Sequence, residues 1–343
     1  MYISLSEVDI WGGFERSSGS IESQFVFIAD LIPISLNTLS ADASIGTDLY
    51  CQGDDPSRAL LYCSANIPLQ SGDLERLRQR GVSKLFISSE GRLEYQKHLR
   101  TVAAGGGEQA VPMSLRSAAL NEVVLAVLQE SFSKGDTSET VTRTAEISRL
   151  AAELVTHQDF ASGDLFRVLH HDYATFTHSA NVAYYLGILA TALGHTSEDV
   201  ERIIAGGLLH DIGKLKVDEK LLIKPGKLDD QEFEIIKKHP RDGFAQLAHR
   251  EDLTFGQLMV VYQHHERLDG RGYPVGCLDQ EIHPWAKMCA VVDIYEAITS
   301  QRPYRKPMHW QQACAILQKD AGEALEREMV ECWISIIRNT MQG

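Results

Sequence analysis

The stretch SEDVERIIAGGLLHDIGK, residues 197–214, determines the expected fold class of the larger part of this chain. Its apolar residues recur at intervals of three and four, at Val200, Ile203, Ile204 and Leu208. That period predicts a helix with one buried face, and it ends in His210 and Asp211 with Gly213 as the expected stop. Taken alone, a buried His-Asp pair is more often a structural hydrogen bond than a metal site. The assignment of a metal site therefore depends on other segments of the sequence.

Two further histidines fall on buried helix faces. His178 lies one helical turn before an apolar helical face. In LDDQEFEIIKKHP, residues 228–240, Phe233 and Ile236 set the predicted buried face and His239 follows. A proline comes next, so this helix should end at His239. Both imidazoles are therefore expected to point inward.

The last candidates are the adjacent His264 and His265, just before a glycine-rich turn, and Asp293. Asp293 lies in KMCAVVDIYEAI, a predicted helix that is apolar on nearly all sides. An unpaired carboxylate there would cost on the order of several kcal/mol of folding free energy or would have to protonate. It needs a cation, which is either Arg302 in an ion pair or a metal ion.

The metal alternative brings together five imidazoles and two carboxylates: His178, His210, Asp211, His239, His264, His265 and Asp293. Zinc favours four ligands, whereas seven nitrogen and oxygen ligands suit two octahedral-type transition ions that share a carboxylate. The sequence therefore predicts a dinuclear metal centre.

The order H…HDIGK…H…HH…DGRGYP…D, continued by AITSQRPYR, resembles the HD-GYP phosphodiesterases, a branch of the HD-domain metal-dependent phosphohydrolases. The resemblance covers roughly residues 166–305. It implies an all-helical fold and two divalent metal ions. Iron or manganese is expected in preference to nickel, cobalt or zinc. It also implies hydrolysis of the 3',5'-phosphodiester bond of cyclic di-GMP to pGpG, GMP or both, by a hydroxide activated between the metals.

The resemblance also assigns residues. One metal would be held by His178, His210, Asp211 and Asp293, and the second, bridged by Asp211, by His239, His264 and His265. Asp211 and Lys214 would be catalytic, with Lys214 holding a phosphate oxygen. The substrate would be contacted by Lys214, Gly272, Tyr273, Pro274, Arg302 and Arg305. Some members bind a third metal through an acidic residue at the position of Ala174, so the alanine here favours two metals. Glu266 and Asp269 would either orient ligand histidines or face solvent.

Two other functions stay open at this point. The helical region could be a catalytically slow module that senses a nucleotide or docks a protein. It could also hydrolyse another cyclic dinucleotide, such as cyclic GMP-AMP, because metal-assisted phosphodiester chemistry is indifferent to the base.

The expected fold class is α+β, with a small β-rich domain followed by an all-α HD-type domain. Residues 1–105 carry short β-rich runs and would form an α/β or mostly β domain that regulates or binds a partner. Residues 106–160 would be a linker and connecting helices, and residues 161–343 the HD-GYP domain. The candidate protein partners are a second copy of the chain and a signalling protein such as a diguanylate cyclase.

Composition restricts the partners further. The 343 residues carry a net charge of −14, which disfavours binding to DNA, RNA or anionic lipid. The six cysteines show no CxxC pair and are expected to be reduced. No basic and apolar leader and no run of 18 apolar residues occurs, so we expect a cytoplasmic protein without membrane insertion.

Overall fold

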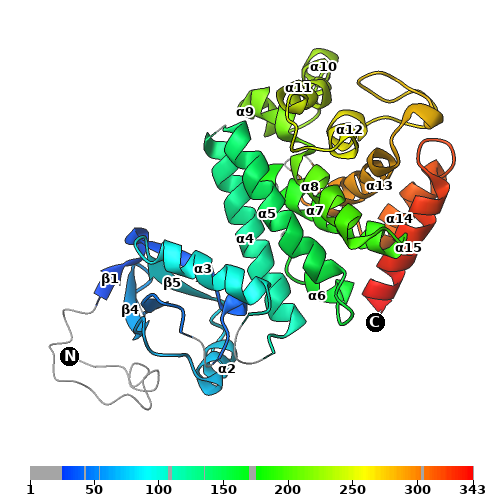
Figure 1. The fold of residues 1–343 in the computed structure, drawn as a ribbon. Coiled ribbons are helices and arrows are strands. Elements are labelled where there is room, and N and C mark those ends of the chain that lie inside the picture. Colours follow the sequence, from blue (N-terminus) through cyan, green and yellow to red (C-terminus); the bar gives the residue numbers. More distant parts are fainter. Residues whose placement is uncertain are drawn as a thin grey trace, which may run out of the picture. The chain divides into compact units, whose positions relative to one another are not determined.

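The computed structural model describes residues 25–41, 44–53, 55–106, 110–134, 136–169, 175–302 and 305–342. The chain divides into two compact units, with the division between His98 and Leu99. The first unit is rich in strands and the second is helical (Figure 1), which confirms the α+β class. We refer to them as the sheet unit and the helical unit.

The sheet unit contains one antiparallel sheet of five strands in the order β1-β4-β3-β5-β2. The strands are β1 (Phe25–Phe27), β2 (Leu31–Ser35), β3 (Leu49–Gln52), β4 (Arg58–Cys63) and β5 (Lys84–Ser88). In β5 the buried Leu85 and Ile87 alternate with less buried residues, as expected for a strand with one face in the core. Pro33 lies in β2 at the edge of the sheet, where a strand tolerates the loss of one N–H donor.

Among the described residues of the sheet unit, two α-helices and two short 3-10 turns accompany the strands. They are α2 (Ser71–Gln79), α3 (Arg92–Ala103), within which the division falls, η2 (Ile28–Asp30) and η3 (Leu36–Thr38). The buried hydroxyl groups of Thr38 and Tyr95 lie 2.6 Å apart, which ties η3 to α3. After α2 the chain turns at Gly81, with φ 76°, and enters β5.

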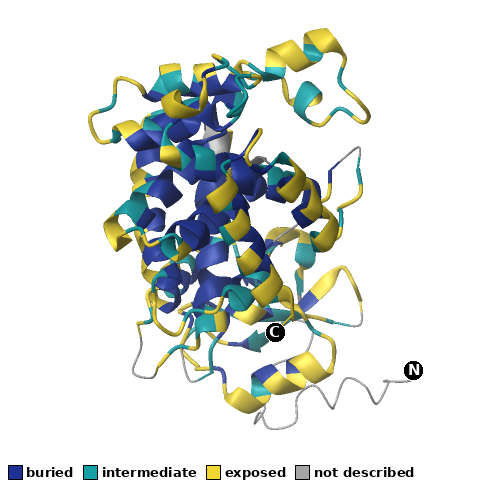
Figure 2. Ribbon diagram, turned by 90° about the vertical axis from the view of Figure 1, so that its right-hand side faces the viewer, coloured by how far each residue is buried: buried dark blue, intermediate teal, exposed yellow. Residues whose placement is uncertain are grey.

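The first helices that lie wholly in the helical unit are the two long helices α4 (Met113–Lys134) and α5 (Thr137–Val155). The later helices are α6 (Ser162–Phe166), α7 (Thr175–Ala192), α8 (Ser197–Leu209), α9 (Glu219–Leu222), α10 (Asp230–Ile236), α11 (His239–Leu247), α12 (Phe255–Gln263), α13 (Pro284–Thr299), α14 (Trp310–Asp320) and α15 (Arg327–Gln342). The 3-10 turns are η4 (Ile212–Lys216) and η5 (Asp279–Glu281). Helix α7 packs against α8, α5 and α13, and Figure 2 shows the buried residues concentrated in the middle of this helical unit.

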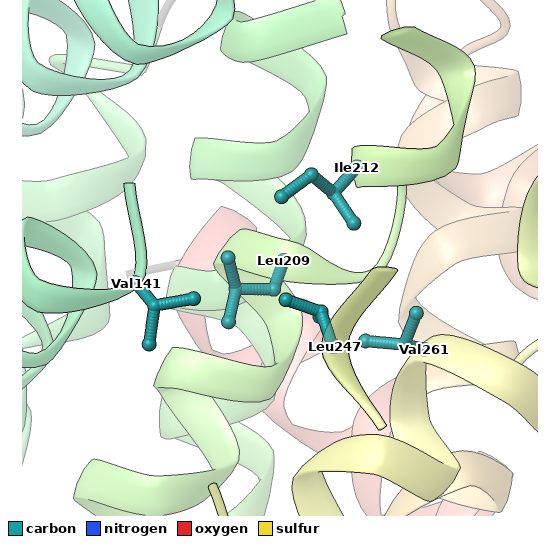
Figure 3. Packing of buried hydrophobic residues seen from close by; sticks show 5 residues of the cluster. All are labelled: Val141, Leu209, Ile212, Leu247 and Val261. Carbon is teal, nitrogen blue, oxygen red and sulfur yellow. The ribbon is translucent and has the colours of Figure 1, made fainter. Parts of the chain in front are cut away.

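One apolar cluster fixes the segment that carries the His-Asp pair. Leu209 and Ile212, which flank the pair, pack with Val141, Leu247 and Val261 (Figure 3). These residues come from the end of α8, η4, α5, α11 and α12. Because both neighbours of the pair are held in this core, the pair itself has little freedom to move.

Two expected helix ends are wrong. Helix α8 ends at Leu209 with His210 as its C-cap, and Gly213 lies in η4. A Cβ atom on Gly213 would overlap the carbonyl oxygen of His239, so glycine is needed there for close packing of η4 on α11. His239 begins α11 instead of ending α10, because Pro240 in the first turn of a helix costs no hydrogen bond.

Phe233 on α10 was expected in the core and is 46% exposed instead. All six cysteines are free thiols, as expected. Among the described residues no helix combines the length and the apolar character that crossing a bilayer requires.

Candidate metal centre

Asp211 lies at the centre of the site, buried just after α8. Its Oδ2 is 3.4 Å from Nε2 of His210 and 3.5 Å from Nε2 of His178. Its Oδ1 is 3.1 Å from Nε2 of His239 and 3.9 Å from Nε2 of His264. The two oxygens of one carboxylate therefore face two separate pairs of imidazoles.

Asp293 on α13 and His265, just after α12, complete the cluster. Oδ1 of Asp293 lies 3.0 Å from Nε2 of His178, and its Oδ2 lies 3.7 Å from Nδ1 of His265. The structure thus brings together all seven side chains expected as ligands. Two sets each offer three ligand atoms that lie within 4.8 Å of one another: His178, His210 and Asp211, and His239, His264 and His265.

Three of the histidines are oriented by main-chain carbonyl groups. The Nδ1 atom lies 2.7 Å from a carbonyl oxygen in His210, 2.8 Å in His239 and 3.0 Å in His264. A carbonyl oxygen can only accept, so each Nδ1 carries the proton in the neutral ring. Each Nε2 therefore presents a lone pair to the middle of the site, as in metal-ligating histidines.

These lone pairs meet other acceptors rather than donors. Nε2 of His239 and Nε2 of His264 lie 3.1 Å apart. Nε2 of His210 and Oδ1 of Asp211 are buried without a hydrogen-bond partner. Buried acceptors that face one another are unfavourable unless a cation lies among them. The donor set of imidazoles and carboxylates fits divalent transition-metal ions.

The charge states of the cluster fit metal binding in part. Burial would lower the pKa of His178, but Glu296 and Asp293 raise it to about 9, so this ring is protonated and a metal ion would displace a proton from it. Burial lowers the pKa of His264 well below its usual range and that of His265 to about 3, so both rings are neutral. Burial would raise the pKa of Asp211, but Lys214, whose Nζ lies 2.5 Å from Oδ2, outweighs it together with His210 and His239, so the pKa stays well below its usual range. In Asp293 burial is outweighed by the neighbouring histidines together, His178 first, and the pKa is lowered as well. Neutral imidazoles and ionised carboxylates are the forms that bind metals.

Glu296 is a buried residue that the sequence analysis does not predict. It accepts a hydrogen bond from Nδ1 of His178, and it also binds Nδ2 of Asn181 at 3.2 Å and Oγ of Ser300 at 2.6 Å. Burial would raise the pKa of Glu296, but His178 outweighs it and lowers the pKa to about 2. The ionised Glu296 holds Nδ1 of His178 and so directs its Nε2 into the site.

A sequence signal for Glu296 exists. It lies three residues after Asp293 in the same buried helix, so both carboxylates fall on neighbouring positions of one face. Arg302 forms its ion pair with Glu296, at 3.2 Å, while Asp293 lies against His178. Arg302 thus lies behind His178, on the side of Glu296.

The glycine-rich loop after α12 lies beside the cluster. The ring of Tyr273 stacks on that of His265 at 4.6 Å and 31°, and Pro274 follows through a cis peptide bond. A Cβ on Gly272 would overlap the main chain of Glu266, which explains the glycine. The buried Glu266 accepts from main-chain N–H groups of the same loop, with Val275 at 2.7 Å. Glu266 therefore positions the loop and not a ligand histidine.

The remaining predicted residues are placed as follows. Asp269 accepts from Arg267 at 2.8 Å, which holds the turn before the loop and lowers the pKa of Asp269 to about 2. Arg305 donates from Nη2 to the carbonyl oxygen of Ala297, and its buried Nε has no hydrogen-bond partner. Ala174, on which the expectation of two rather than three metals depends, lies outside the described residues.

Comparison with known proteins agrees with this geometry. A family model described as HD domain matches residues 165–329. The chain is 34% identical over 259 residues to the cyclic di-GMP phosphodiesterase PA4108 of Pseudomonas aeruginosa, an alignment that covers 71% of this chain and 62% of the relative. These findings confirm the expected resemblance.

Other relatives carry related names. A cyclic di-GMP phosphodiesterase of Thermotoga maritima is 33% identical over 55% of this chain and 53% of its own length. The 3'3'-cGAMP-specific phosphodiesterase 1 of Vibrio cholerae is 36% identical over 49% of this chain and 38% of its own length. The chain thus spans between about two fifths and three fifths of the length of these relatives.

A solved structure supports the fold. Bd1817, an HDG"Y"P protein from Bdellovibrio bacteriovorus, aligns with a TM-score of 0.65 over 90% of this chain and 100% of its own, at 18% identity.

Proposed function

We propose that this chain is a metal-dependent phosphodiesterase that hydrolyses a cyclic dinucleotide, because residues 165–329 match the HD domain family model. Cyclic di-GMP is the proposed substrate, with pGpG, GMP or both as products. The names of the relatives from Pseudomonas aeruginosa and Thermotoga maritima support this choice. The observation that carries the proposal is that the two oxygens of Asp211 face two separate imidazole pairs.

We further propose that two divalent ions, iron or manganese, bind here. The first would be held by His178, His210, Asp211 and Asp293, and the second by Asp211, His239, His264 and His265. Divalent ions bound by these residues would supply Lewis acidity toward the phosphate and make a bound water acidic. The support is the division of the ligand atoms into two sets with Asp211 between them.

The chain's own groups have separate tasks in this proposal. Lys214, whose Nζ lies 2.5 Å from Oδ2 of Asp211, would hold a phosphate oxygen as a point charge. Asp211 would stay ionised beside it. Glu296 would keep the proton of His178 on Nδ1, so that Nε2 stays available as a ligand. Tyr273 would stack on a base, and the guanidinium of Arg305 would contact phosphate.

The test combines metal analysis with product identification. Protein purified without oxygen and loaded with Fe(II) or Mn(II) should contain about two ions per chain and convert cyclic di-GMP to pGpG or GMP. Asp211→Asn should abolish turnover, whereas His249→Gln, which changes an exposed histidine after α11, should not. No product from the loaded protein would reject the enzyme proposal and favour a nucleotide-sensing or protein-docking module.

A second substrate is favoured by one finding. The Vibrio cholerae relative named as a 3'3'-cGAMP-specific phosphodiesterase is 36% identical to this chain over 172 aligned residues. Rates measured on 3'3'-cGAMP beside cyclic di-GMP decide between the two dinucleotides. A higher kcat/KM on 3'3'-cGAMP would reassign the substrate and leave the metal chemistry in place.

We also propose that residues 1–105 regulate the hydrolase or bind its partner, either a second copy of the chain or a signalling protein such as a diguanylate cyclase. The separate compact unit that ends at His98 supports this division of labour. Removal of residues 1–105 should change the oligomeric state or the activity of the protein. Unchanged values of both would reject the regulatory role.

A further inference from the structure

The metal centre is open to solvent on one side. Among the seven candidate ligands, the side chain of His265 is 25% exposed, whereas each of the other six is at most 9% exposed. The side chain of Lys214 is 17% exposed. A substrate therefore reaches the centre past His265 and Lys214, and residues that border this opening contact the rest of the substrate.

Aromatic rings extend from His265 to the surface. Tyr273 stacks on His265, and the ring of Phe233 on α10 lies edge-on to Tyr273 at 6.5 Å and 79°. The ammonium of Lys237 lies 5.6 Å from the centre of the Phe233 ring and 5.7 Å from that of Tyr273. A cation is thus held between two aromatic rings at the border of the opening.

Phe233 lies outside the apolar core. Its sequence position predicts a core residue, but 46% of it is exposed to solvent. An exposed phenyl ring is a surface on which a flat ligand can stack. Lys237 also pairs with Glu234 at 2.7 Å, so its ammonium is already held near the ring.

We propose that Phe233 and Lys237 form a subsite for the half of the dinucleotide that is not being cleaved. This inference rests on the proposed function. A cyclic dinucleotide carries two bases and two phosphates, and only one phosphate can lie at Asp211. A purine would stack on the exposed face of Phe233, and the second phosphate would pair with the ammonium of Lys237.

The stacking contact is tested with Phe233→Leu in the metal-loaded full chain. Leucine keeps an apolar side chain but loses the flat ring, and base stacking is worth enough to raise KM about tenfold or more. We expect unchanged kcat and metal content, because this contact is equally strong in the bound substrate and the transition state. Phe233→Tyr should restore KM. Phe255→Leu, at a phenylalanine that is 68% exposed at the start of α12, is the matched control and should not change KM.

The charge contact is tested with two substitutions of opposite sign. Lys237→Gln should raise KM severalfold and reduce its dependence on salt. Glu234→Gln removes the competing carboxylate and should lower KM, by about twofold at low salt. Equal KM values for the wild-type protein, Lys237→Gln and Glu234→Gln would overturn the assignment of Lys237 to the subsite.

The outcomes separate this inference from the proposed function. If the wild-type protein turns over a dinucleotide but Phe233→Leu has the same KM, the subsite is wrong and the enzyme proposal stands. If kcat and metal content fall in Phe233→Leu and tyrosine does not restore them, Phe233 is a structural residue and the subsite is again wrong. If the wild-type protein gives no product, the Kd for cyclic di-GMP from equilibrium dialysis replaces KM, and a Kd unchanged by Phe233→Leu rejects the subsite.

Discussion

The sheet unit and the helical unit both bury histidine, with different consequences. In the sheet unit His98 has a buried Nε2 without a hydrogen-bond partner, and burial lowers its pKa so that the ring is neutral. In the helical unit five histidines surround two carboxylates that stay ionised, and beside these carboxylates and Glu296 the pKa of His178 is raised to about 9. A lone imidazole escapes the cost of burial by losing its proton, but a cluster that keeps its negative charge needs cations. The ionised carboxylates, and not the buried histidines alone, therefore distinguish the metal centre from the site of His98.

Metal removal should lower the thermal stability of the helical unit and leave that of the sheet unit unchanged. Ions present at about a thousand times their Kd stabilise the native state by roughly 4 kcal/mol, which is about 10 °C in Tm for a domain of this size. A strong chelator should therefore lower the Tm of the helical unit by about that amount in scanning calorimetry. The transition of the sheet unit should not move. If the chelator lowers the Tm of both units equally, or of neither, metal binding in the helical unit alone is contradicted.

Gly213→Ala should be the most destabilising small substitution beside the cluster. The added methyl group overlaps the carbonyl oxygen of His239, and overpacking of this kind costs about 3 kcal/mol. The free energy of unfolding from urea titration measures it. Gly163→Ala, in α6, is the control, because no atom lies within 4 Å of the new Cβ. If both variants are equally stable, η4 does not depend on contact with α11.

Glu296→Gln should weaken metal binding without unfolding the protein. The neutral amide oxygen accepts from Nδ1 of His178 but lacks the negative charge of the carboxylate, and weakening of such a partner costs about 10- to 100-fold in metal affinity. Titration with Mn(II) gives the affinity, and circular dichroism checks the fold. An affinity equal to that of the wild-type protein would show that His178 is oriented without Glu296.

The smallest effect is expected at His98. Burial lowers its pKa in the folded protein, so the unfolded state takes up a proton first as the pH falls. The sheet unit should therefore lose stability as the pH falls below about 6.5, the ordinary histidine value. His98→Gln should remove this part of the pH dependence, measured as Tm between pH 7 and pH 5. An identical pH profile in the variant would show that His98 does not contribute.

The sequence could predict part of the cluster because some of its ligands lie on helix faces that periodicity identifies. His178 and Asp293 are placed by apolar residues at helical spacing, and both are buried in the structure. Periodicity says which face of a helix is buried but not which helix lies opposite. The packing role of Gly213 and the contact of Glu296 with His178 depend on such neighbours, so they could not be read from one segment.

Phe233 shows a second limit. Helix α10 has only seven residues, too few for the period to separate a face in the core from a face at an opening. Hydrophobicity predicts burial for this residue, and its exposure becomes visible only once α10 is placed beside the loop of Tyr273.

The most direct test of the central claim is the electron paramagnetic resonance spectrum of the Mn(II)-loaded protein, together with its metal content. The account predicts two ions per chain with the spectrum of an exchange-coupled pair, and loss of that coupling in Asp211→Asn. A single ion per chain, or two uncoupled ions in the wild-type protein, would contradict the role of Asp211 as the group shared by two metals.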